Sequence, residues 1–138
     1  MLATIFKTLL TYSGIILPLP ASDDLDKLCD RIFAADSNIR FVGAIDKMGT
    51  LVAGGMRKGI KPLEPREDRR KLYLEFALRN AMRSEFDPEY GKTIYTMSER
   101  EKIKIASFPY GDYLILISIE KKAQHDKVIA KVLKLLLD

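Results

Sequence analysis

The chain has very few residues of the kinds that build disulfides, metal centres or nucleophilic active sites. Its 138 residues include one cysteine, Cys29, and one histidine, His125. A single cysteine excludes an intrachain disulfide and suits a reducing compartment, and a structural zinc site needs about four nitrogen or sulfur ligands. Cys29 shares the apolar spacing of its neighbours, so we expect a buried, inert thiol, with His125 at the surface. We expect a cytoplasmic protein with no metal and no cofactor.

The sequence also lacks an apolar run long enough to cross a membrane. Residues 1–20 carry one charged side chain, Lys7, but their uninterrupted apolar stretches are far shorter than the ~20 residues of a membrane span. Pro18 and Pro20 end any helix there. Residues 1–21 are therefore a weak signal or anchor, an accessory helix, or an extension outside the domain at residues 22–138. A membrane is not an expected partner.

Motifs of common enzymes are missing too. Residues 54–59 read GGMRKG, but no serine or threonine follows a lysine there as in a nucleotide-binding loop. Backbone amides beside Arg57 and Lys58 could bind an anion, and the alternative is an ordinary loop that ends a strand. Carboxylate pairs such as Asp23 and Asp24 fit a helix start. We assign no catalytic residue and expect a protein that is not an enzyme.

Positive charge is concentrated in one segment. Residues 57–71 hold seven basic and three acidic side chains, and the difference of four equals the net charge of the whole chain, +4. Such a patch attracts phosphate, acidic protein or anionic lipid. The candidate partner-binding or anion-binding residues are Arg57, Lys58, Arg66, Arg69 and Arg70. The alternative is a solvated loop and helix start, and nucleic acid is not an expected partner.

Hydrophobic spacing predicts an α+β fold. Steps of three and four residues predict helices from residue 22 to a stop at 36–38, over about 66–84 and over about 123–137. Alternation and apolar runs predict a hairpin over 41–56 and strands over 92–98, 102–108 and 113–119. Asp46 and Gly49 suit the hairpin turn. A five-stranded antiparallel sheet, with the almost uniformly apolar 113–119 strand inside it and helices packed on it, would bury every apolar face.

The predicted helix over 66–84 has a wider apolar stripe than one contact with a sheet requires. Its main apolar face consists of Leu74, Ala77, Leu78, Ala81 and Met82. Tyr73 and Phe76 fall beside that face. We expect this aromatic pair to be exposed and to mark a surface for a partner.

The order of elements resembles the roadblock/dynein-light-chain domain, a relative of the longin and profilin-like folds. The likeness is carried by residues 41–55, an apolar strand, an Asp-x-x-Gly turn and a return strand of small residues. The LVAGGM…G…PL pattern of residues 51–63 also resembles a group of short archaeal proteins of unassigned activity.

This resemblance implies an interaction module rather than an enzyme. Roadblock-like domains form homodimers or heterodimers by joining sheets edge to edge and packing their second helices together, and they act as scaffolds and regulators of small Ras-like GTPases. On this chain, the dimer surface would be the 92–98 strand and the 66–84 helix, with Tyr73, Phe76, Asn80 and Tyr95.

Two other functions stay open. The chain could be a small-molecule-sensing domain of profilin-like or PAS-like shape, which requires a sizeable cavity between sheet and helix. It could instead bind an anion or nucleic acid through residues 57–71, in which case binding would weaken steeply with salt.

Overall fold

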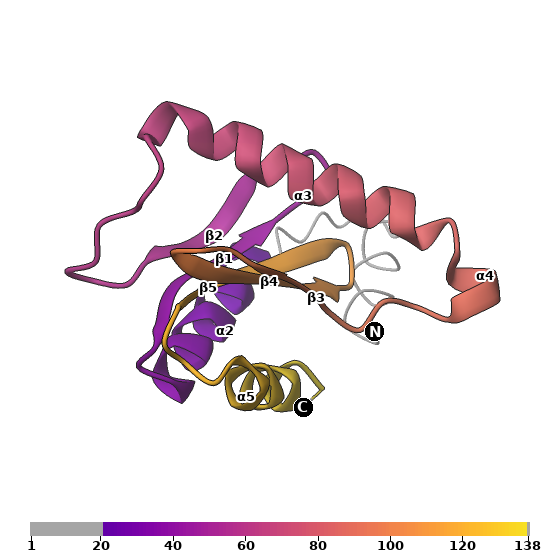
Figure 1. Ribbon diagram of the computed structural model, residues 1–138. Helices are drawn as coiled ribbons and strands as arrows, with labels where there is room; N and C mark the ends of the chain where they lie inside the picture. Colours follow the sequence, from indigo (N-terminus) through magenta and orange to yellow (C-terminus); the bar gives the residue numbers. More distant parts are fainter. Residues whose placement is uncertain (1–20, 138) are drawn as a thin grey trace.

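The computed structural model describes residues 21–137, so the alternatives for residues 1–20 lie outside the described part of the chain. The elements in chain order are α2 (Ala21–Ala35), β1 (Ile39–Ile45), β2 (Leu51–Met56), the 3₁₀ turn η1 (Arg66–Asp68), α3 (Arg69–Ser84), α4 (Asp87–Tyr90), β3 (Thr96–Glu99), β4 (Ile103–Tyr110), β5 (Tyr113–Glu120) and α5 (His125–Leu137). Figure 1 shows three layers, with α3 above the sheet and α2 and α5 below it.

The sheet has five strands in the order β2-β1-β5-β4-β3, and every neighbouring pair is antiparallel. The predicted α+β fold is therefore confirmed, and the almost uniformly apolar strand, β5, lies at the centre of the sheet. The sheet has two edges, β2 and β3. Because an edge strand leaves a row of backbone groups unpaired, these edges are the places where another strand could be added.

The β1–β2 turn is built as the sequence predicted. Asp46 accepts hydrogen bonds through Oδ1 from the backbone amides of Met48 and Thr50, at 2.9 and 3.0 Å. Gly49 has a φ of +76°, which favours glycine. A Cβ at Gly49 would lie 2.6 Å from the Cα of Leu74, so the turn is in direct contact with the backbone of α3. The β1–β2 turn and α3 are therefore packed closely together at Gly49.

The alternation along β1 and β5 separates two apolar cores. Val42 and Ile117 belong to the core shared with α2 and α5. Ile45 and Leu116 belong to a smaller core shared with α3. Because β5 is buried on both faces, it contributes to both cores, which explains why its sequence is almost entirely apolar.

The strand predicted over residues 92–98 is wrong in its first half, because β3 covers only Thr96–Glu99. Thr96 pairs with Ser107, so the same register would set Ile94 opposite Pro109 two residues further along. Proline has no amide hydrogen to give to a ladder, and the pairing stops before it. The short helix α4 was not predicted; it carries proline in its first turn and ends at Gly91, whose φ is +80°.

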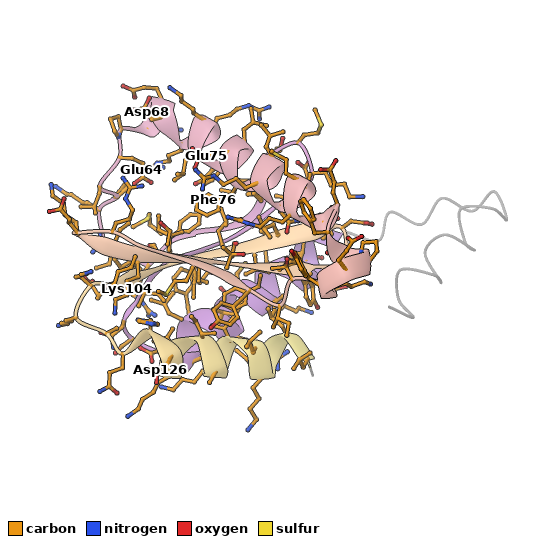
Figure 2. The ribbon with its side chains drawn as sticks, turned by 45° about the vertical axis from the view of Figure 1, so that its right-hand side comes forward. Glu64, Asp68, Glu75, Phe76, Lys104 and Asp126 are labelled. Atoms are coloured by element: carbon orange, nitrogen blue, oxygen red, sulfur yellow. The ribbon has the colours of Figure 1, made fainter. Side chains whose placement is uncertain are left out.

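Lys104 is another departure from the sequence pattern. Alternation along β4 places Lys104 on the same face of the sheet as α5. The residue is only 6% exposed. Its Nζ donates a hydrogen bond to the carbonyl of Ala123 at 2.7 Å and lies 3.0 Å from Nδ1 of His125. Figure 2 shows Lys104 between the sheet and α5. The lysine therefore fastens the start of α5 to the sheet.

Candidate self-association surface

Helix α3 turns its aromatic side chains toward the sheet, opposite to the sequence prediction. Tyr73 is 8% exposed, and its ring stacks on that of Phe41 with centroids 6.0 Å apart. Phe76 packs against the same core and lies between helix and sheet in Figure 2. Burial raises the pKa of the Tyr73 hydroxyl above its ordinary value. Tyr73 is buried and Phe76 is half-buried within one subunit, so the prediction that they form an exposed pair is wrong.

The other two residues predicted for the dimer surface are placed differently. Asn80 is half-buried and lines an open groove near the C-terminal end of α3. Tyr95 is 44% exposed and stands just before β3, with its ring centroid 6.1 Å from that of Phe108. Of the four residues, Tyr95 alone presents a large part of its side chain to solvent next to the sheet edge.

The outward face of α3 carries the apolar surface that the aromatic pair was expected to supply. Leu74, Leu78 and Met82 are 39%, 55% and 65% exposed, four residues apart along the helix. Beyond the helix end, Phe86 and Tyr90 stack on each other at 6.1 Å and are 55% and 85% exposed. Large apolar side chains gathered on one exposed face usually mark a contact with another molecule. Sequence reasoning placed the first three toward the core.

A different arrangement is found at the basic segment, where Arg57 is structural. Its Nε donates to the carbonyl of Ile39 at 2.7 Å, and its Nη2 donates to the carbonyls of Phe33 and Asp36, both at 2.8 Å. The guanidinium also lies over the ring of Phe33, 5.0 Å from its centroid. Arg57 therefore links the C-terminal end of α2 to β1. Carbonyls at the end of a helix lack hydrogen-bond partners within the helix, and the guanidinium supplies one. These contacts give Arg57 a structural role, and its assignment as a partner-binding or anion-binding residue stays a prediction.

The remaining basic candidates lie in the loop before α3 and in its first turn. Lys58, Arg66 and Arg70 are exposed, and Arg70 donates a 3.3 Å hydrogen bond to Oγ1 of Thr50. Arg69 is half-buried, and its Nε has no hydrogen-bond partner within the described residues. These residues line the N-terminal end of α3 and the loop before it. Their role as partner-binding or anion-binding residues stays a prediction.

Space between α3 and the sheet is small. A cavity of about 40 Å³ lies there, lined by residues that include Tyr73, Phe76 and Leu116. Small-molecule pockets usually measure ~300–1,000 Å³, and 40 Å³ is room for about one or two waters. A larger groove of about 580 Å³ opens between the C-terminal half of α3 and the turns beneath it. The cavity at Tyr73 and Phe76 is thus too small for a metabolite, whereas the open groove has a volume within the usual range of ligand pockets.

Groups with reactive potential are placed as follows. Cys29 is 1% exposed, and burial, followed by the nearby charges of Asp26 and Asp30, raises its pKa to about 11. This position agrees with the expected inert thiol, since the thiolate is the reactive form. His125 is half-buried at the start of α5, beside Lys104, rather than fully at the surface. Within residues 21–137, no cluster of three potential metal ligands is found.

Membrane spanning was also considered for the described helices. None of the helices in residues 21–137 combines the length and the apolar character needed to cross a bilayer.

The family of the chain follows from comparison with known sequences. A model described as "Family of unknown function (DUF6659)" matches residues 21–137. The chain belongs to this family. A search of curated proteins finds no match.

Solved structures with a similar fold include roadblock domains. The Roadblock/LC7 domain from Streptomyces avermitilis has a TM-score of 0.62 and 9% identity, over 81% of this chain and 91% of that chain. Myxococcus xanthus MglB has a TM-score of 0.62 and 18% identity, over 81% and 88%. An MglB described with a tetrameric arrangement has a TM-score of 0.61 and 11% identity, over 88% and 93%. This DUF6659 chain therefore has the roadblock fold that its order of elements predicted.

Proposed function

We propose that this DUF6659 chain is a non-enzymatic interaction module of the cytoplasm that self-associates and serves as a scaffold or regulator of a small GTPase. The outward apolar face of α3, together with the open β3 edge, is the observation that supports the proposal. These are the two elements through which a roadblock-like resemblance implies dimers. Its grouping with short archaeal proteins stays a prediction.

The exposed apolar side chains of α3 give a physical reason for self-association. Leu74, Leu78 and Met82 form one continuous stripe that no described residue covers. β3 has only four residues and, among the described strands, pairs with β4 alone. A second copy would cover apolar surface and complete backbone hydrogen bonds at the same time. An MglB, which shares this fold at low identity, has been described with a tetrameric arrangement.

Light scattering coupled to size exclusion tests the self-association step. The wild-type chain should elute as a dimer, and Leu78→Glu should shift it to monomer because a charge would be buried in the interface. Leu137→Glu is the matched control, since Leu137 is 84% exposed on α5 in the opposite layer. A wild-type chain that stays monomeric at the highest soluble concentration would refute self-association. A Leu78→Glu variant that still dimerises would remove α3 from the interface.

The GTPase step needs a separate measurement. The immobilised full chain would be offered each purified small Ras-like GTPase encoded in the same genome, loaded with GDP or with a non-hydrolysable GTP analogue. We expect one of them to bind with an affinity that depends on the nucleotide. If none binds in either state, the regulator assignment is wrong, and self-association can still stand.

A further inference from the structure

The open groove of about 580 Å³ combines apolar surface with charged side chains. Ala77 and Leu114 line it and are buried, and Ala81 lines it and is exposed. Two turns at one end of the sheet also line it, the β1–β2 turn through Asp46 and the β4–β5 turn through Asp112. We call this space, between the C-terminal half of α3 and the two turns, the α3 groove.

The α3 groove is acidic in a chain that is basic overall. Its charged lining residues are three aspartates and two lysines: Asp46, Asp87, Asp112, Lys47 and Lys92. By contrast, residues 21–138 hold 22 basic and 19 acidic side chains, because Lys7 is the one charged residue before them. An occupant with apolar side chains and one positive charge would therefore complement the groove in both respects.

The chain enters the described part of the structure at the same end of the sheet. Three residues join α2 to β1, so the two elements run in opposite directions on the sheet. The 15 residues of α2 span about 22 Å and the seven of β1 about 23 Å. Ala21 therefore lies toward the end of β1 at Ile45, beside the β1–β2 turn that lines the α3 groove.

The length of residues 1–20 is sufficient to pass from α2 to the groove. Figure 1 shows α2 below the sheet and α3 above it, so the segment has to round the end of the sheet. Twenty residues reach up to ~66 Å when extended. A domain of this size has a radius of gyration of only ~13 Å.

Residues 1–20 also have the chemistry that the α3 groove requires. Apolar residues recur there at the steps typical of one face of a helix: Leu2, Ile5, Phe6, Leu9 and Leu10. Lys7 supplies the single positive charge. Pro18 and Pro20 oppose a straight extension of α2 into these residues, which favours a change of direction before Ala21.

We propose that residues 1–20 dock in the α3 groove of their own chain, with apolar side chains against Ala77, Ala81 and Leu114 and with Lys7 toward the aspartates. The segment is then an accessory element of the domain rather than a signal or an anchor. The proposal does not depend on self-association.

Fluorescence tests the docking, because the chain contains no tryptophan. Phe6→Trp in the full chain should emit at shorter wavelength, and be quenched less by acrylamide, than the same variant unfolded in urea. Adding Ala81→Arg should abolish this shift, since a bulky cation fills the groove and repels Lys7. Ala130→Arg is the matched control, because Ala130 is an exposed alanine on α5 in the opposite layer.

The role of Lys7 is tested in the same Phe6→Trp chain. Lys7→Glu should reduce the shift in emission, since it sets a carboxylate among the aspartates. Lys7→Arg should preserve the shift because it keeps the charge. Equal effects of the two substitutions would overturn the contact with the aspartates.

A spin label locates the docked segment. Ser84→Cys places a reactive thiol at an exposed residue of the groove, and the buried Cys29 stays unlabelled. A nitroxide there should broaden the amide signals of residues 1–20 in the NMR spectrum. The same label at Lys127→Cys, exposed on α5, should leave those signals sharp.

Mixing distinguishes docking within a chain from docking on a second copy. Isotope-labelled chains without nitroxide, mixed with unlabelled chains that carry it at position 84, should show no broadening of residues 1–20. Broadening in the mixture would overturn docking within the chain. Emission equal to that of the unfolded chain, or a shift that survives Ala81→Arg, would overturn the groove as the site. Each of these failures leaves the proposed function standing.

Discussion

Gly49 is the point at which the hairpin turn and α3 depend on each other, and Gly49→Ala tests that dependence. The new Cβ would lie 2.6 Å from the Cα of Leu74, whereas ordinary contacts begin near 3.4 Å, so α3 would have to move by about 0.8 Å. Repulsion of this kind in a packed site costs ~1–3 kcal/mol. The φ of +76° adds the ~1–2 kcal/mol that an L-residue loses in the left-handed region. Together these give a loss of about 2 to 5 kcal/mol.

Gly59→Ala is the matched control for this substitution. Gly59 has a φ of +85°, but a Cβ there would meet no atom within 4 Å. It should therefore lose the backbone contribution alone, ~1–2 kcal/mol. The difference between the two variants isolates the contact between the turn and α3.

Urea unfolding of both variants measures that difference. With a slope of ~1–3 kcal/mol per molar urea, the midpoint of Gly49→Ala should fall below that of Gly59→Ala by about 1 M. Because the displaced helix also carries the exposed Leu74, Leu78 and Met82, Gly49→Ala should weaken dimerisation more than Gly59→Ala does. Equal midpoints for the two alanine variants would show that the turn does not press on α3, and the reasoning from close contact would be refuted.

Three further predictions concern the buried and charged groups. Arg57→Lys should lower the free energy of unfolding by about 1–3 kcal/mol in a urea titration, because a lysine cannot reach the three carbonyls that the guanidinium contacts. The control, Lys58→Arg, should leave the free energy of unfolding unchanged. An equal effect of both substitutions would contradict a structural role for Arg57. Cys29 should resist a thiol reagent at neutral pH until the chain unfolds, since burial raises its pKa to about 11; fast labelling of the native protein would contradict this. Burial acts to raise the pKa of Asp36, but hydrogen bonds from Asn38 and Lys131 leave it lowered from 3.8. Its stabilising contribution is therefore present above pH 3.8 and is lost as the pH falls below that value. Asp36→Asn should be less stable than wild type at neutral pH and should converge with it in acid, and a gap that persists in acid would refute the ion pair with Lys131.

Most of the fold could be predicted because its signals are local. Asp46 and Gly49 carry the geometry of the hairpin turn in their own chemistry, and the apolar run over residues 113–119 is what a strand buried on both faces requires. The end of the 92–98 strand could not be read in the same way. It depends on Pro109, which meets that strand only through a register that the folded sheet fixes.

The orientation of α3 was wrong because apolar residues cover more than half of its circumference. Leu78 and Met82 on one side and Tyr73 and Ala77 on the other fit a helix period equally well, so apolar spacing does not decide which side meets the sheet. The charged residues hold the missing signal. Lys71, Glu75, Arg79 and Arg83 recur every four residues and mark the solvent side, opposite the side that packs on Phe41.

Arg57 shows the corresponding limit for charge. A count of charges in residues 57–71 treats all seven basic side chains alike. The guanidinium of Arg57, however, donates hydrogen bonds to carbonyls near the end of α2 and the start of β1. These carbonyls lie 18 to 24 positions earlier in the chain. No pattern within the segment reveals them.

The apolar stripe on α3 limits how much free energy this helix can contribute to a dimer. Burying a leucine or methionine side chain fully is worth ~1.5–3 kcal/mol, and Leu74, Leu78 and Met82 are about half exposed, so two copies would gain about 5 to 9 kcal/mol. Association costs ~4–15 kcal/mol in lost freedom of motion. The helices alone would therefore pair weakly at best. A stable dimer also requires contributions from the β3 edge, and a change that removes either element should be enough to separate the two copies.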